Sequence, residues 1–112
     1  MSEILDVTTT ILHPPPRHEA EILILTSLGI SDVPVNLHQG LCNYLLLGIR
    51  PGDFLTAVLK NDLRDAVCRS IDPSKLGPLV EWLNNAVPAP SWGSPQRVER
   101  WITYKTVPGA SL

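Results

Sequence analysis

"GIRPGDFLTAVLKND", residues 48–62, joins a Gly-Pro-Gly cluster to an apolar helical pattern and determines how the rest of the chain divides. Gly48 is typical of a residue that ends a helix, and Pro51 of one that begins the next. Asp53 then falls in the first turn, where its charge suits the helix dipole. A phosphate-binding loop would need a Lys-Ser/Thr pair after its glycines, and Pro51 lacks a backbone donor. The cluster is therefore interpreted as helix punctuation.

The composition limits the classes of protein that the chain can represent. Its 112 residues suit one domain, with 44% hydrophobic and 18% charged residues and a net charge of −2. This balance gives no electrostatic reason to bind nucleic acid or an anionic membrane. The sequence shows neither a membrane-spanning apolar run nor a secretory signal, which predicts a soluble, cytoplasmic protein. Its two cysteines, Cys42 and Cys68, are too few for a disulfide scaffold and are expected to be reduced.

The chain after Pro34 has the pattern of a compact bundle of four helices. Each predicted helix begins at a proline signal and carries an apolar stripe, and the short connections predict that successive helices pack together. The expected ranges are about 34–47, 51–70, 73–86 and 95–103. Residues 34–104 form the predicted helical domain, and residues 105–112 are expected to be a frayed tail.

Residues 1–33 are predicted to form an extended or partly β N-terminal arm. The proline run 14–16 favours extended backbone. The two similar segments 3–12 and 21–30 are rich in β-branched residues, which permits a hairpin. The second segment also has a helical spacing. The preferred interpretation is a strand for 3–12 and a helix for 21–30, with the alternatives left open.

Asp62 is unusual because the helical pattern places it within the apolar stripe of the predicted helix 51–70. A carboxylate that faces a core is costly unless it has a partner. Arg69 lies two turns further on, and the free N–H groups at another helix start are a second possible partner. Asp62 is therefore predicted to be a structural cap or part of a buried pair with Arg69.

His38 and Cys42 are the principal candidates for catalytic or metal chemistry, because they lie four residues apart on one predicted helix. The spacing suits a metal or a thiol–imidazole pair. Further ligands with metal-site spacing are missing from the sequence, and no Gly-x-Ser-x-Gly turn supports a serine triad. Neither a catalytic residue nor a metal or other cofactor is predicted.

The candidate partner-binding residues are Trp92 and exposed charges on the second and fourth predicted helices. Trp92 lies in a loop between Pro90 and the helix start at Ser94-Pro95, where a tryptophan either covers the core or anchors a partner. The charged candidates are Arg64, Asp65, Arg97 and Arg100.

Three segments resemble an uncharacterised family of small helical proteins from bacteriophages, prophages and plasmids. They are "GIRPGDFLTAVLKNDLRDAVCR", "VEWLNNAVP" and "SWGSPQRVERWI", and the resemblance covers residues 34–103. It implies a mobile-element origin, action in the cytoplasm of a bacterial host cell and a compact helical fold. It implies no reaction and no catalytic residue.

The leading hypothesis is a non-enzymatic protein that binds a host protein complex, because small phage proteins without a catalytic constellation often act in this way. Inhibitors of CRISPR-Cas defence complexes are one such group. The alternatives are a small nucleic-acid-binding regulator, a thiol enzyme that uses Cys42 with His38, and a structural homo-oligomer. The last would associate through Leu46 and Leu47, which lie off the main apolar stripe of their helix.

Overall fold

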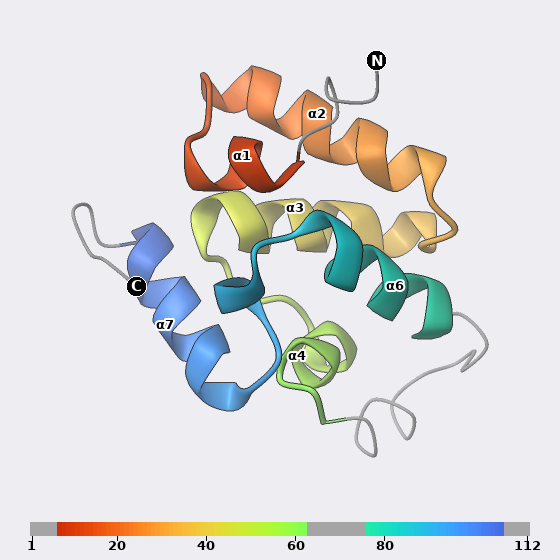
Figure 1. Cartoon of the computed structure of the whole chain (residues 1–112), viewed down its shortest axis with the longest axis vertical. Coiled ribbons are helices and arrows are strands. Elements are labelled where there is room, and N and C mark those ends of the chain that lie inside the picture. Colours follow the sequence, from red (N-terminus) through yellow and green to blue (C-terminus); the bar gives the residue numbers. More distant parts are fainter. Residues whose placement is uncertain (1–6, 63–75, 107–112) are drawn as a thin grey trace.

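The computed structural model describes residues 7–62 and 76–106, and within these ranges the chain is mainly helical and contains no strand (Figure 1). The α-helices of the described ranges are α1 (Val7–Leu12), α2 (Arg17–Ile30), α3 (His38–Leu47), α4 (Asp53–Leu59), α6 (Leu76–Ala86) and α7 (Pro95–Thr106). Two short 3-10 helices accompany them, η2 (Val35–Leu37) and η4 (Ala89–Ser91). None of the helices in the described ranges combines the length and apolar composition that crossing a membrane requires.

The central element is α3, which the other helices surround. In Figure 1, α1 and α2 lie above it, α4 and α6 lie below it, and α7 flanks it at the left. Four of its side chains have fully buried positions in the core, namely Leu41, Cys42, Tyr44 and Leu45. The burial of so much of one ten-residue helix makes α3 the common packing surface for the whole fold.

The expected N-terminal arm is not confirmed, because residues 7–12 and 17–30 form two helices. The strand preferred for segment 3–12 is wrong over residues 7–12, whereas the preferred helix for 21–30 is confirmed within α2. In α1, Val7, Thr10 and Ile11 are buried together at helical spacing. Their burial against the core outweighs the β preference of these branched residues, which is a weak and context-dependent bias.

The Gly-Pro-Gly cluster acts as punctuation, as predicted. Gly48 ends α3 in the left-handed conformation, with φ of 70°, and its N–H donates to the Tyr44 carbonyl. A Cβ at this position would lie 2.9 Å from the carbonyl oxygen of Ile102. Glycine is thus required both by the backbone angle and by the close approach of α7. The next helix, α4, begins at Asp53 rather than at Pro51.

The predicted long helix 51–70 is wrong, because α4 ends at Leu59. The N–H of Asn61 donates to the Val58 carbonyl, and the N–H of Asp62 donates to the Ala57 carbonyl. These two bonds form a Schellman motif, with Asn61 in the left-handed conformation at φ of 62°. Asparagine tolerates that conformation better than most residues.

Asp62 is consequently exposed, so its predicted place in the core stripe is also wrong. The chain leaves the helix before residue 62, and the helical spacing that placed this carboxylate inward no longer applies. The predicted partner Arg69 and the predicted helix start at Asp72-Pro73 lie outside the described residues.

The last two helices agree better with prediction. In α6, Leu79, Trp82 and Leu83 are buried. At the start of α7, the Ser94 hydroxyl accepts a hydrogen bond of 3.2 Å from the Arg97 N–H, so Ser94 caps the helix that is predicted to begin at Ser94-Pro95. The predicted frayed tail is wrong at residues 105 and 106, since α7 continues through them.

Candidate protein-binding surface

The loop before α7 is held in one conformation by hydrogen bonds to the core. The Tyr44 hydroxyl donates to the Ser91 carbonyl at 2.6 Å, and the Ser91 hydroxyl donates to the Pro88 carbonyl at 2.6 Å. The Gly93 N–H donates to the Leu59 carbonyl at 2.7 Å. The Tyr44 and Leu59 bonds tie the loop to α3 and α4, so the loop backbone that carries Trp92 is positioned relative to the rest of the fold.

Trp92 lies on this loop as a partly buried side chain that packs against the core. Its carbonyl and that of Ala89 both lie 3.4 Å from Nη1 of Arg97, which donates to them. Trp92 therefore covers the core with part of its indole and leaves the remainder accessible. The guanidinium of Arg97 lies beside the backbone carbonyl of Trp92.

Arg97, Arg100 and Tyr104 follow one another along the same edge of α7, at spacings of three and four residues. Arg97 and Arg100 are exposed, and Tyr104 is half-buried. These three residues and Trp92, whose carbonyl Arg97 contacts, are called here the Trp92–Tyr104 strip. Arg100 has no ion pair with any residue in the described ranges.

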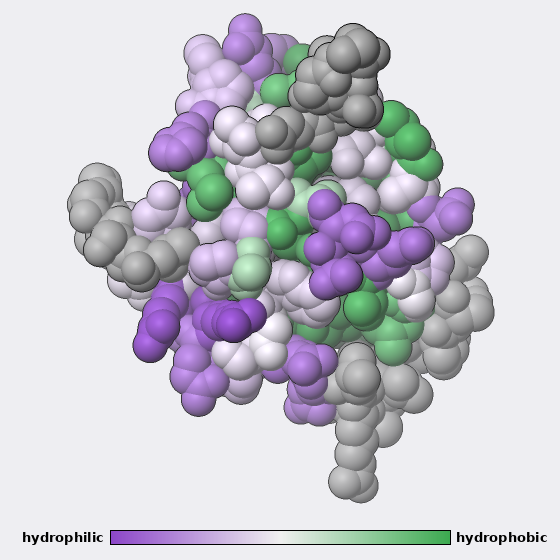
Figure 2. Space-filling view, in the orientation of Figure 1, coloured by the Kyte–Doolittle hydropathy of each residue, from purple (hydrophilic) through white to green (hydrophobic). Residues whose placement is uncertain are grey.

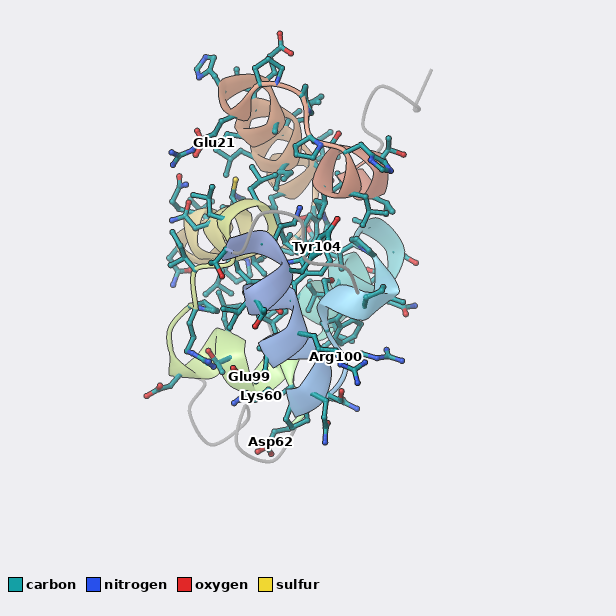
Figure 3. All side chains as sticks on the ribbon, turned by 90° about the vertical axis from the view of Figure 1, so that its left-hand side faces the viewer. Glu21, Lys60, Asp62, Glu99, Arg100 and Tyr104 are labelled. Carbon is teal, nitrogen blue, oxygen red and sulfur yellow. The ribbon has the colours of Figure 1, made fainter. Side chains whose placement is uncertain are left out.

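The opposite edge of α7 carries the helix's carboxylate, Glu99, and Figure 3 shows Glu99 and Arg100 on the two sides of the helix. Nη2 of Arg50 lies 2.8 and 2.9 Å from the two oxygens of Glu99, and Nζ of Lys60 lies 4.0 Å away. The Arg50 and Glu99 side chains are 46% and 54% exposed, so the pair contributes little to stability. Its consequence is that the carboxylate is directed away from Arg97 and Arg100.

Three of the five predicted partner-binding residues thus come together, namely Trp92, Arg97 and Arg100. The other two, Arg64 and Asp65, lie outside the described residues.

His38 and Cys42 do not have the features of a reactive thiol–imidazole pair. Cys42 is fully buried, and burial together with the charge of Glu21 raises the pKa of its thiol to about 11. A nucleophilic cysteine needs a lowered pKa. The ring nitrogen Nε2 of His38 lies 2.8 Å from the Val33 carbonyl oxygen. Groups of three or more His, Cys, Asp or Glu residues placed to share a metal ion do not occur within residues 7–62 and 76–106.

Lys105 is a structural residue that the sequence did not indicate. Its ammonium group donates to the Ile11 carbonyl and lies 5.1 Å and 5.3 Å from the ring centres of Trp101 and Tyr104. Burial lowers the pKa of this amine. Lys105 therefore ties α1 to α7 and supports the Tyr104 end of the strip from behind.

A second notable surface lies on α2 and η2, where large apolar side chains are exposed. Ile22 is 50% exposed, Ile30 is 70% exposed and Val35 is 80% exposed, and residues 22–31 include no charged residue. Figure 2 shows apolar side chains reaching the surface on the side of the molecule where α2 ends. The predicted apolar surface at Leu46 and Leu47 is instead half-buried, and Leu46 packs against the core.

Comparison of the chain with protein-family models, with curated proteins and with solved structures found no match.

Proposed function

We propose that the chain is a non-enzymatic protein, carried by a phage or another mobile element, that binds a host protein complex through the Trp92–Tyr104 strip. A bacterial defence complex of the CRISPR-Cas type is the candidate partner that the sequence resemblance suggests. The observation that supports this proposal is the preorganisation of Trp92 and Arg97. Tryptophan and arginine are the residue types most enriched in binding hot spots.

Fixing such side chains before binding lowers the entropy that a partner interaction must overcome. The Tyr44–Ser91 and Gly93–Leu59 hydrogen bonds hold the loop on which Trp92 lies. The bonds from Arg97 to two loop carbonyls orient its side chain. The strip therefore combines a loop that is tied to the core with an arginine that is hydrogen-bonded to the backbone of that loop.

The proposal is tested by capture from a lysate of the bacterial host, with the purified full-length chain immobilised. We expect one partner complex to be retained at a fixed stoichiometry, and retention to be lost in Trp92→Ala and Arg100→Glu. Arg100 is exposed, so its substitution leaves the core intact. Ile49→Ala is the matched control for Trp92→Ala, because Ile49 is a 50% exposed apolar residue outside the strip. Absence of a stoichiometric partner, or equal capture by all variants, would contradict the proposal.

A second candidate function is a structural homo-oligomer, which the exposed apolar residues of α2 and η2 favour. An exposed, uncharged helix stretch is typical of an interaction surface. Light scattering over a range of concentrations tests it. A mass that rises with concentration in the wild type and falls to that of one chain in Ile30→Lys supports self-association, and a constant mass of one chain rejects it.

A further inference from the structure

The charges around α7 are unevenly distributed. Among the described lysines and arginines, Arg50, Lys60, Arg97, Arg100 and Lys105 lie on α7 or bind it, and the remaining one is Arg17. The carboxylate on α7 itself, Glu99, is bound by Arg50, and the ammonium group of Lys105 points inward to the Ile11 carbonyl. Arg97 and Arg100 are left as two exposed guanidinium groups on one edge.

The spacing of these two groups is suited to a pair of carboxylates. They are three residues apart, which corresponds to a rise of about 4.5 Å along the helix. Each guanidinium has five N–H donors in a planar fork and binds a carboxylate through two parallel hydrogen bonds. The two bonds that Arg97 makes to loop carbonyls are long, at 3.4 Å, and both use Nη1. Its remaining donors are thus available to a partner.

Half-buried aromatic side chains lie at both ends of the arginine pair, Trp92 at the loop and Tyr104 one turn beyond Arg100. Aromatic rings beside a charged pair supply apolar contact area and exclude water from the ionic bonds. An acidic segment that also carries apolar side chains would satisfy both parts of the strip.

Nucleic acid fits the same surface less well. Two arginines neutralise two phosphates, which corresponds to a salt-dependence slope of only about −1.8 for a duplex. The chain as a whole has a net charge of −2, which opposes the approach of a long polyanion. A short protein segment with a few carboxylates depends less on this overall charge.

We infer that the Trp92–Tyr104 strip docks an acidic protein segment, with carboxylates placed one helical turn apart to pair with Arg97 and Arg100. This inference rests on the proposed function and adds to it the chemistry of the partner. The partner segment is expected to be an amphipathic helix in which Asp or Glu residues lie next to leucine-like or aromatic side chains.

The test is a selection of displayed random peptides, about 16 residues long, against the full-length chain. The selected peptides are then synthesised, labelled and titrated by fluorescence anisotropy against the wild type and three variants. Arg97→Ala and Arg100→Glu alter the strip. Arg17→Glu makes the same change of charge as Arg100→Glu at an exposed position at the start of α2 and is the matched control.

We expect the selected peptides to contain acidic residues three or four apart, and Arg100→Glu to weaken their binding by at least about tenfold. Arg17→Glu should leave their affinity within about twofold of the wild type. Peptides without acidic pairs, or none that depends on Arg100, would overturn the inference, as would equal losses in Arg17→Glu and Arg100→Glu. If a labelled single-stranded oligonucleotide binds more tightly than the selected peptides at the same salt concentration, the strip is assigned to nucleic acid instead.

These outcomes are separable from failure of the proposed function. If a host partner is captured through the strip but acidic peptides are not selected, the partner chemistry is wrong and the protein-binding function stands. If neither a host partner nor a peptide binds, both are wrong.

Discussion

Replacement of Tyr44 by Phe tests the bond that holds the binding loop on the core. The ring of Tyr44 is fully buried in α3, and its hydroxyl donates at 2.6 Å to the carbonyl of Ser91, a residue 47 positions away in the chain. Burial raises the pKa of the phenol, so the hydroxyl keeps its proton and remains a donor throughout the neutral range. Phenylalanine retains the ring and its packing and removes only this bond.

The expected cost follows from the burial of both partners. Ser91 is also fully buried, so its carbonyl loses its Tyr44 donor in a position that bulk water does not reach. Removing one partner of a buried hydrogen bond costs roughly 1–3 kcal/mol, because the other partner keeps its desolvation penalty. We therefore expect the free energy of unfolding to fall by about 2 kcal/mol, which corresponds to roughly 8 °C in Tm for a domain of this size.

The measurement is urea-induced unfolding of the wild type, Tyr44→Phe and the control Tyr104→Phe. The control removes the same atoms from a half-buried tyrosine that makes no hydrogen bond to the described residues through its hydroxyl. We expect the control to lose less than about 0.5 kcal/mol. If Tyr44→Phe is no less stable than Tyr104→Phe, the loop is not held by this bond and the argument for a rigid strip fails.

Three further predictions concern the helix junctions and the core. Gly48→Ala should lower the free energy of unfolding by about 2 kcal/mol or more, since φ is 70° and a Cβ would meet backbone at 2.9 Å. Gly29→Ala, where a Cβ meets no atom within 4 Å, should raise it by up to about 1 kcal/mol, and thermal unfolding of the pair checks both signs. The raised pKa of the buried Cys42 thiol, about 11, predicts that stability is lost as pH rises above 9, because the unfolded chain then releases a proton that the folded chain keeps. Urea titrations from pH 8 to 11 should show that the free energy of unfolding declines less steeply with pH in Cys42→Ala than in the wild type. Identical declines in the two proteins would refute the raised pKa of Cys42. Lys105→Met should lower the free energy of unfolding by about 1–2 kcal/mol, because the buried Ile11 carbonyl loses its Lys105 donor. Hydrogen exchange should then show faster opening of α1. Unchanged exchange would show that Lys105 does not tie α1 to α7.

The features predicted correctly from the sequence are those set by local backbone chemistry. Gly48 ends a helix because its left-handed conformation is costly for other residues. The glycine is therefore enough to indicate the end of the helix from the sequence. Ser94 followed by Pro95 begins a helix for a similar reason, because the serine hydroxyl caps it and proline suits its first turn.

The features that the sequence does not predict depend on contacts between distant parts of the chain or on a backbone conformation that a residue permits without requiring. Residues 7–11 have β-branched side chains and become helical through burial that a short window cannot reveal. Asn61 ends α4 through a left-handed conformation that asparagine permits without requiring, so the apolar pattern predicts a longer helix than the chain forms. The longer predicted helix also places Asp62 in an apolar stripe, whereas its side chain is exposed.

The sequence predicts only part of the candidate site. The sequence predicts partner-binding roles for Trp92, Arg97 and Arg100 from their residue types and their place near a helix start. Their common surface depends on the Tyr44–Ser91 bond, which links residues too far apart in the chain for any local pattern to predict. The support from Lys105 depends likewise on a contact with α1, 94 residues away in sequence.

The central claim is that the Trp92–Tyr104 strip binds a host protein, and site-specific photocrosslinking in host cells tests it most directly. A photoreactive amino acid is placed at Gln96, an exposed residue of α7 next to Arg97, and separately at Thr26, an exposed residue of α2. We predict a crosslink from position 96 to one host protein, lost when Arg100→Glu is added, and no crosslink to that protein from position 26. A host protein crosslinked from position 26 but not from 96, or no host protein crosslinked from 96, would contradict the account.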